Sequence, residues 1–147
     1  MKSAFTLVEV LIVLSVIAGI MTIITPMAMG ASKRAKIRSV AFSLRNTAQA
    51  LTFYMYTKAE KMSSASETDL SWLTVGFLVN DNDLSVDPGN IEIEWPDGDI
   101  SDGTATARVE YTGGDLPVSD LKETWDEIDD DDNDGNPDVV RNFTKYW

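Results

Sequence analysis

The chain opens with a long apolar run. Residues 10–32 carry no charged side chain, and Val, Ile, Leu and Met occupy every face of the helix that this composition predicts. At about 1.5 Å per residue the helix spans roughly 35 Å, enough to cross a hydrocarbon core of about 30 Å. We therefore expect a transmembrane helix. A secretory signal peptide is the alternative, although its apolar centre is normally only about 7–15 residues long.

The helical pattern continues from residue 31 to about residue 61, where apolar residues recur at intervals of three and four. These positions are Ile37, Val40, Ala41, Leu44, Ala48, Leu51 and Met55. Such spacing predicts one apolar face, which we expect to pack beneath a sheet formed by the rest of the chain. The two helical halves should form one spine. We expect a kink or break at Pro26, because proline has no N–H to donate to the preceding turn.

Alternating segments predict strands in residues 62–147. Apolar and polar residues alternate over 91–95 and over 105–111, so these segments should pair as an antiparallel hairpin. Residues 139–147 are expected to form a last strand. The predicted fold class is α+β, with a long N-terminal helical spine packed against a small antiparallel β-sheet head of three or four strands.

Two further head segments are less regular. Residues 73–79 are apolar but contain Gly76, so their pattern leaves a strand and a short helix both open. Residues 119–128 predict a short helix capped by Ser119. Its buried face would consist of Leu121, Trp125 and Ile128.

Composition removes several classes of function. The 147 residues include no Cys and no His, which excludes disulfides, thiolate metal sites and acid–base catalysis by histidine. A hydrolase built on carboxylates, Ser or Lys is compatible with this composition, but no motif has catalytic geometry, so we expect a protein that is not an enzyme. The net charge of −12 makes nucleic acid an unlikely partner.

Charge is divided unevenly along the chain. Residues 33–61 have a net charge of +6, whereas residues 62–147 have a net charge of −18. The basic stretch could face anionic lipid headgroups or the acidic heads of neighbouring copies. A solvated helix face is the third interpretation.

The N-terminal residues carry a resemblance to a known family. Lys2-Ser3-Ala4, followed by the apolar segment Phe-Thr-Leu-Val-Glu that starts at Phe5, resembles the leader and N-terminus of type IV pilin-like proteins. That group includes type IV pilins and the pseudopilins of type II secretion, and the resemblance extends to about residue 60. It implies that a prepilin peptidase cuts between Ala4 and Phe5 and methylates the new amine. Ala4 stands where the family usually has Gly, and cleavage is still expected because alanine is small.

The resemblance also implies an assembly mechanism. Glu9 would meet the N-terminal amine of a neighbouring subunit, with Phe5 and Glu9 as the assembly residues, and Pro26 lies where family members break the helix. An unpaired carboxylate in a low-dielectric bundle is costly, so such a pair would set the register between subunits. The implied partners are further copies in a helical filament, the peptidase, inner-membrane assembly machinery and, before assembly, membrane lipid. The N-terminus would be cytoplasmic before assembly, and the filament would be periplasmic or extracellular.

An acidic loop near the C-terminus predicts a metal site. Counting back from Gly135 gives the frame D-x-D-x-D-G-x-x-D, in which alternate carboxylates can face one cavity. The candidate ligands are Asp130, Asp132, Asp134, Asp138 and the backbone carbonyl of Asn136. Calcium suits such a flexible all-oxygen shell better than magnesium does. An EF-hand has Glu at the twelfth position of its loop, but the twelfth position counted from Asp130 is Arg141, so this loop is not an EF-hand. It resembles the shorter calcium loops of thrombospondin-type repeats.

A calcium ion there would be structural and would pin the last strand to the sheet. Some pilins and pseudopilins carry a calcium site near the C-terminus, which the resemblance adds as support. A solvated acidic loop is the alternative. The expected organisation is a leader at 1–4, a transmembrane and assembly helix at 5–32, an amphipathic half-helix at 33–61 and an acidic β-rich head at 62–147, with the calcium loop at 129–138.

These features favour a structural subunit of a type IV pilus-like filament. A major-type pseudopilin of a type II secretion system is the alternative. A membrane-anchored minor pilin or adhesin that binds a ligand through its head also remains open.

Overall fold

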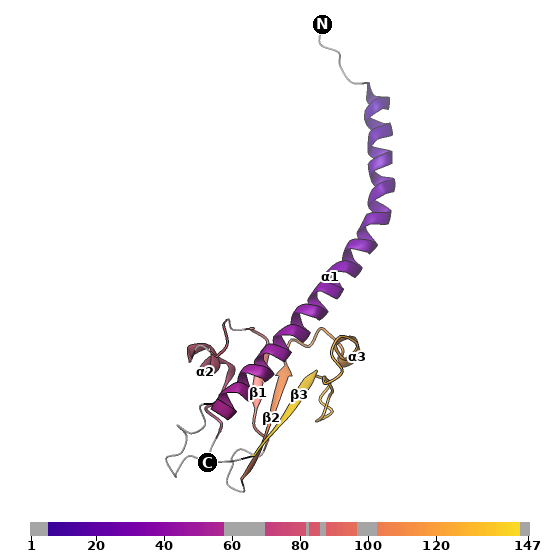
Figure 1. The fold of residues 1–147 in the computed structure, drawn as a ribbon. Coiled ribbons are helices and arrows are strands. Elements are labelled where there is room, and N and C mark those ends of the chain that lie inside the picture. The colour runs from indigo at the N-terminus through magenta and orange to yellow at the C-terminus, as the bar shows by residue number, and fades with distance from the viewer. Residues whose placement is uncertain (1–5, 58–69, 82, 86–87, 97–102, 145–147) are drawn as a thin grey trace. The chain divides into compact units, whose positions relative to one another are not determined.

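The computed structural model describes residues 6–57, 70–81, 83–85, 88–96 and 103–144 (Figure 1). The chain divides into two compact units, residues 1–36 and 37–147. Helix α1 (Leu7–Thr57) contributes residues to both.

In the first unit the described structure consists of Thr6 and the first part of α1, and all but one of the α1 residues there are exposed. It is the one helix among the described residues that is long and apolar enough to cross a membrane. The chain remains helical through Pro26, so no melted turn is present there, and the kink stays a prediction. Proline removes a single N–H from the ladder, and threonine hydroxyls supply extra bonds nearby: Thr22 donates to the Gly19 carbonyl at 2.7 Å and Thr25 donates to the Met21 carbonyl at 2.8 Å.

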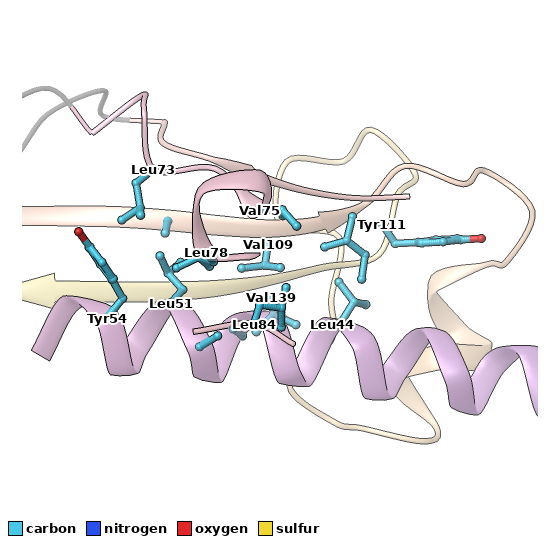
Figure 2. Close-up of a cluster of buried hydrophobic side chains, with 14 of the residues drawn as sticks. Leu44, Leu51, Tyr54, Leu73, Val75, Leu78, Leu84, Val109, Tyr111 and Val139 are labelled. Carbon is cyan, nitrogen blue, oxygen red and sulfur yellow. The ribbon is translucent and has the colours of Figure 1, made fainter. Parts of the chain in front are cut away.

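In the second unit the predicted apolar stripe of α1 is confirmed. Leu44, Ala48 and Leu51 are completely buried, and Ile37 and Val40 pack at the edge of the core. Figure 2 shows side chains of α1 directed at the strands. The last predicted helical residues, 58–61, lie outside the described part of the chain.

The sheet has three antiparallel strands in the order β1 (Ile91–Glu94), β2 (Thr104–Tyr111) and β3 (Asp138–Thr144). Val109 of the central strand lies opposite Ile93 on one side and Val139 on the other. The α+β fold class, the hairpin and the last strand are therefore confirmed. Residues 145–147 and the hairpin loop at 97–102 are outside the described residues.

Helix α2 (Val75–Asn80) resolves the segment that the sequence left open. Thr74 caps it, since the Thr74 hydroxyl accepts a hydrogen bond from the Phe77 N–H at 3.3 Å. The ring of Phe77 meets Tyr54 of α1 edge-on, with 5.5 Å between ring centroids, so α2 is fixed against the core by aromatic contacts.

Helix α3 (Val118–Lys122) is shorter than the predicted helix over 119–128, and Ser119 is not its cap. Pro117 occupies the N-cap position without a side-chain bond, and its restricted φ of −72° suits the start of a helix. Leu121 and Ile128 are both buried as expected, but the chain between them forms turns rather than further helix. Leu121 and Ile128 can therefore both be buried, as the apolar spacing predicted, without a longer helix between them.

Candidate functional site

The start of α1 is held by a reciprocal set of hydrogen bonds. The Thr6 N–H and the Thr6 hydroxyl both donate to Glu9 Oε2, at 2.8 and 2.7 Å, and the Glu9 N–H donates to the Thr6 hydroxyl at 3.3 Å. This arrangement is a capping box, which satisfies N–H groups that a helix N-terminus otherwise leaves unpaired. Ala4 and Phe5, the expected cleavage residues, lie outside the described residues.

The cap gives Glu9 a role that the sequence interpretation missed. The signal was present as Thr-x-x-Glu immediately before an apolar run. A carboxylate can accept several hydrogen bonds, so a capped Glu9 retains the capacity to accept one from an amine as well. The hydrogen bonds of the cap therefore fix the position of the Glu9 carboxylate at the start of α1.

We predict that Thr6→Ala loosens the first turn of α1, whereas Thr6→Ser does not. Loss of an N-cap hydroxyl costs about 1 kcal/mol, and serine restores the same bonds. Amide hydrogen exchange of residues 7–10 in detergent micelles measures the effect. Equal protection in the alanine and serine variants would contradict a capping role.

The acidic loop lies between Ile128 and β3 and is closed at its base by backbone pairing. Asp129 and Asp138 exchange two backbone hydrogen bonds, at 3.0 and 2.9 Å. Within the loop Asn133 and Gly135 adopt positive φ values of 61° and 92°. Asparagine and glycine tolerate this left-handed region, which explains why the chain can turn sharply here.

Three of the predicted ligands converge. Asp130, Asp132 and Asp134 each offer a carboxylate oxygen, and these oxygens all lie within 4.8 Å of one another. Two oxygens bound to one calcium ion at 2.3–2.6 Å are separated by at most about 5 Å, so the spacing fits calcium. Backbone N–H groups orient them: Gly135 donates to Asp130 at 3.3 Å and Asn136 donates to Asp134 at 2.7 Å.

Asp138 has a different partner. Its side chain is buried, and its Oδ2 accepts from the Asp131 N–H at 3.1 Å and lies 3.2 Å from Arg108 Nε. Burial raises the pKa of Asp138 to about 6, against the opposing influence of the Asp131 N–H and the Arg108 charge. The structure thus places Asp138 in an ion pair with Arg108, next to the three converging carboxylates.

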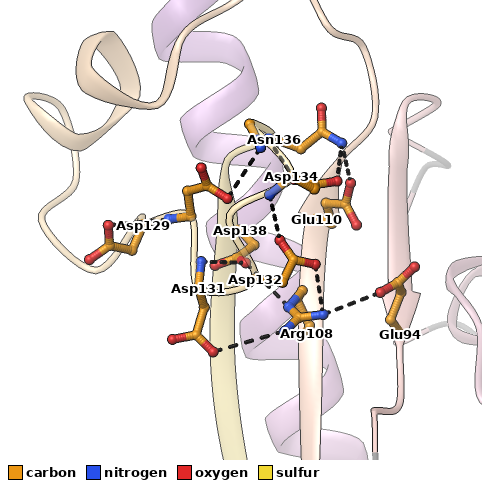
Figure 3. Close-up of polar contacts among 11 residues, drawn as sticks. Glu94, Arg108, Glu110, Asp129, Asp131, Asp132, Asp134, Asn136 and Asp138 are labelled. Atoms are coloured by element: carbon orange, nitrogen blue, oxygen red, sulfur yellow. Dashed lines mark hydrogen bonds and ion pairs between the residues drawn. The ribbon is translucent and has the colours of Figure 1, made fainter.

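Two residues of β2 that the sequence interpretation did not single out support the loop (Figure 3). Arg108 Nη1 lies 3.0 Å from Asp132 Oδ2 and 3.4 Å from Glu94 Oε2. Glu110 is buried, which raises its pKa, and its Oε1 accepts from Asn136 Nδ2 at 2.6 Å. Both residues occupy alternate positions of one strand, so they project to the same side of the sheet.

Asn136 therefore has a function besides the expected backbone carbonyl. Its side-chain Nδ2 donates to Glu110 and also to Asp134 Oδ2, each at 2.6 Å. The amide joins a converging carboxylate to the central strand. Alternation in β2 predicted polar residues at positions 108 and 110, but nothing local in the sequence indicated that they face the loop.

Comparison with known protein families, curated proteins and solved structures finds no match. The long apolar N-terminal helix whose second half packs on a small antiparallel sheet fits a pilin-like fold.

We predict that Arg108→Met destabilises the second unit by about 3–5 kcal/mol, because it leaves the buried Asp138 carboxylate without its cation. Adding Asp138→Asn should recover part of the loss, since the double variant buries no unpaired charge. Chemical denaturation of the full chain in detergent, followed by tryptophan fluorescence, measures both. An additive or larger loss in the double variant would show that the two residues are not coupled as an ion pair.

Proposed function

We propose that the chain is a structural subunit that polymerises through its N-terminal helix into a type IV pilus-like filament. The observation that carries this proposal is the contrast between the two parts of α1. Residues 10–29 carry no charge and are all exposed, whereas residues 41–55 supply one side of a buried core. Because no other residue that the structure describes covers this part of the helix, we expect lipid or other copies of the chain to cover it.

The position of Glu9 supports the assembly role. It is the single charged residue of the chain between Lys2 and Lys33, and α1 begins beside it. A lone carboxylate in an apolar environment is expensive and is expected to have a specific partner. The resemblance supplies one, the methylated amine that cleavage between Ala4 and Phe5 would create on a neighbouring subunit.

The proposed topology comes from the resemblance and not from the helix itself, because the basic residues after the span, such as Lys33 and Arg34, would favour the opposite orientation by the positive-inside rule. Before assembly the N-terminus is cytoplasmic, α1 is anchored in the inner membrane and the head is outside the cytoplasm. We assign the chain no enzymatic activity; its partners are lipid, the peptidase, the assembly machinery and other copies of itself.

We further propose that the acidic loop binds calcium through Asp130, Asp132 and Asp134. The convergence of their oxygens within 4.8 Å supports this assignment. The ion would offset the repulsion among these carboxylates and hold the loop onto β2 and the start of β3. Its contribution is structural, as in other sites where metal binding is coupled to folding.

We predict that calcium raises the melting temperature of the head and that a chelator reverses the effect. At 100 times its Kd, calcium would add about 2.7 kcal/mol of stability. The double variant Asp130→Asn/Asp134→Asn should lose the response, whereas Asp126→Asn, a change of an exposed residue outside the converging group, should keep it. Calorimetry with calcium and with magnesium measures the difference; an unchanged melting temperature of the wild-type chain would refute the site.

We predict that sheared surface filaments contain a chain that begins at methylated Phe5. Intact mass spectrometry of filament and membrane fractions measures this directly. Glu9→Gln keeps the size of the side chain and the capping oxygen but removes the charge, so this variant should be processed normally and be absent from filaments.

The fractions also separate the alternatives. A processed chain confined to membranes would favour a pseudopilin or a minor subunit over a surface pilus. A chain that still begins at Met1 in every fraction would contradict assembly and leave a membrane-anchored binding protein.

A further inference from the structure

Arg108 is surrounded by more carboxylates than its single charge can balance. Its side chain is only 13% exposed and projects from the central strand β2 next to the acidic loop (Figure 3). Four carboxylates have an oxygen within 3.9 Å of a guanidinium nitrogen, and they belong to β1, the loop and the start of β3: Glu94, Asp131, Asp132 and Asp138. The guanidinium is therefore a counter-ion that several acidic residues share.

The contacts of Arg108 do not form a rigid clamp. The one hydrogen bond that its side chain donates among the described residues runs from Nη1 to Glu94 Oε2, at 3.4 Å. Nε is buried and has no hydrogen-bond partner in the described part of the chain, although Asp138 Oδ2 lies 3.2 Å away. Two parallel N–H bonds to one carboxylate make an arginine pair specific and strong, and Arg108 makes no such pair with a described residue. Attraction between charges, and not a fixed set of hydrogen bonds, holds the guanidinium near the loop.

Asp132 connects Arg108 to the proposed calcium site. Its Oδ2 lies 3.0 Å from Arg108 Nη1, and its carboxylate is also one of the three that converge in the loop. Calcium binds carboxylate oxygens at 2.3–2.6 Å, so an ion on Asp132 Oδ2 would lie at most about 5.6 Å from Nη1. Two cations at that separation repel each other strongly even at an effective dielectric constant of about 20. Calcium and Arg108 would therefore draw on the same carboxylate.

Backbone N–H groups of the loop orient the three converging carboxylates without help from the guanidinium. The Asp134 N–H donates to Asp132 Oδ1 at 3.3 Å, and the other two carboxylates accept the backbone hydrogen bonds described above. The base of the loop is closed by the backbone pair between Asp129 and Asp138. Removing the charge of Arg108 should therefore leave the ligand oxygens close to one another.

We propose that Arg108 is an internal counter-ion that competes with calcium for the acidic loop and so sets the affinity of the loop for the ion. This inference rests on the proposed calcium site and adds the residue that regulates it. In the absence of the ion, the guanidinium offsets part of the repulsion among the carboxylates and holds the loop against β2. When calcium binds, the same positive charge opposes it. Calcium affinity depends on the charge that surrounds the ion, and Arg108 reduces the negative charge of this site.

Glu94 gives Arg108 a second partner when calcium takes Asp132. Nη1 lies 3.4 Å from Glu94 Oε2 and 3.0 Å from Asp132 Oδ2, so the guanidinium reaches both carboxylates from one position on β2. Arginine stays charged at every physiological pH, so the competition depends on calcium concentration and not on protonation of Arg108. A loop with this device keeps its fold at low calcium and binds the ion reversibly at higher concentrations.

Isothermal titration calorimetry of the full chain in a nonionic detergent tests the competition, with calcium chloride as the probe. Arg108→Gln should lower the Kd for calcium by about tenfold or more, although this variant is less stable than wild type without the ion. A residue that only supported the ligands would have the opposite effect, because its removal would weaken binding. Arg108→Lys keeps the positive charge and should bind calcium about as weakly as the wild type.

Arg141→Gln is the matched control. It removes the same charge from the neighbouring strand β3, where Arg141 pairs with Glu127 and lies over the ring of Trp125. At physiological ionic strength, exposed charges more than about 8 Å apart are largely screened, so this change should leave the Kd nearly the same. An equal gain of affinity in the control would reduce the effect to net charge and overturn the inference.

A second background keeps the test decisive if Arg108→Gln does not fold without calcium. Asp138→Asn removes the buried carboxylate that Arg108 balances, so the double variant Arg108→Gln/Asp138→Asn buries no unpaired charge. The double variant is compared with Asp138→Asn alone, and it should again bind calcium about tenfold or more tightly. Melting temperatures provide a second readout, since a tenfold lower Kd adds about 1.4 kcal/mol to the stabilisation by saturating calcium.

The outcomes separate this inference from the proposals on which it rests. If the wild type binds calcium and removal of Arg108 leaves the Kd equal or higher in both backgrounds, the counter-ion role is overturned and the calcium site stands. Absence of binding in the wild type and in every variant would refute the calcium site and the competition together. Binding by the Arg108→Gln variants alone would support the competition. The filament proposal is independent of this titration, because its test is the mass of the processed chain in filaments.

Discussion

Burial of one stripe of α1 against a three-stranded sheet is the interaction on which the second unit depends. The sheet is too small to form a core alone, and its inner face is covered by Leu44, Ala48 and Leu51 of the helix. Burial of a leucine contributes roughly 1.5–3 kcal/mol, so a few such residues account for much of the marginal stability of a small domain. The other side of this helix and its first half are exposed among the described residues. These exposed surfaces are the reason to consider assembly with other copies of the chain.

The central strand β2 connects this core to the acidic loop. Val109 faces the core between Arg108 and Glu110, and these two charged residues reach the loop from the other side of the strand. The arrangement of the carboxylates in the loop therefore depends on contacts with the most completely buried strand. A loop with many like charges would otherwise have little reason to hold one conformation.

Much of the fold could be predicted from periodicity. The helical stripe from Ile37 to Met55 and the two alternating strands were both readable, because local spacing decides which face is buried. The length of α3 could not be read in the same way, since two buried anchors are compatible with either helix or turns between them. At Pro26 the spacing could not decide between a kink and a melted turn, and the helix continues there because proline removes only one hydrogen bond from the ladder. At the loop, the three converging carboxylates followed from the D-x-D-x-D spacing. The pairing of Asp138 with Arg108 depends on strand register, which joins residues thirty positions apart and leaves no local trace.

The hydroxyl groups of the apolar helix have an energetic consequence. Ser15, Thr22 and Thr25 each donate to a carbonyl of their own helix, so their polar hydrogens are satisfied internally. Such a helix presents much the same surface to hydrocarbon tails and to apolar protein. Transfer of these hydroxyls from water into an apolar environment would therefore cost less than transfer of unbonded hydroxyls, because their hydrogen bonds are kept within the helix.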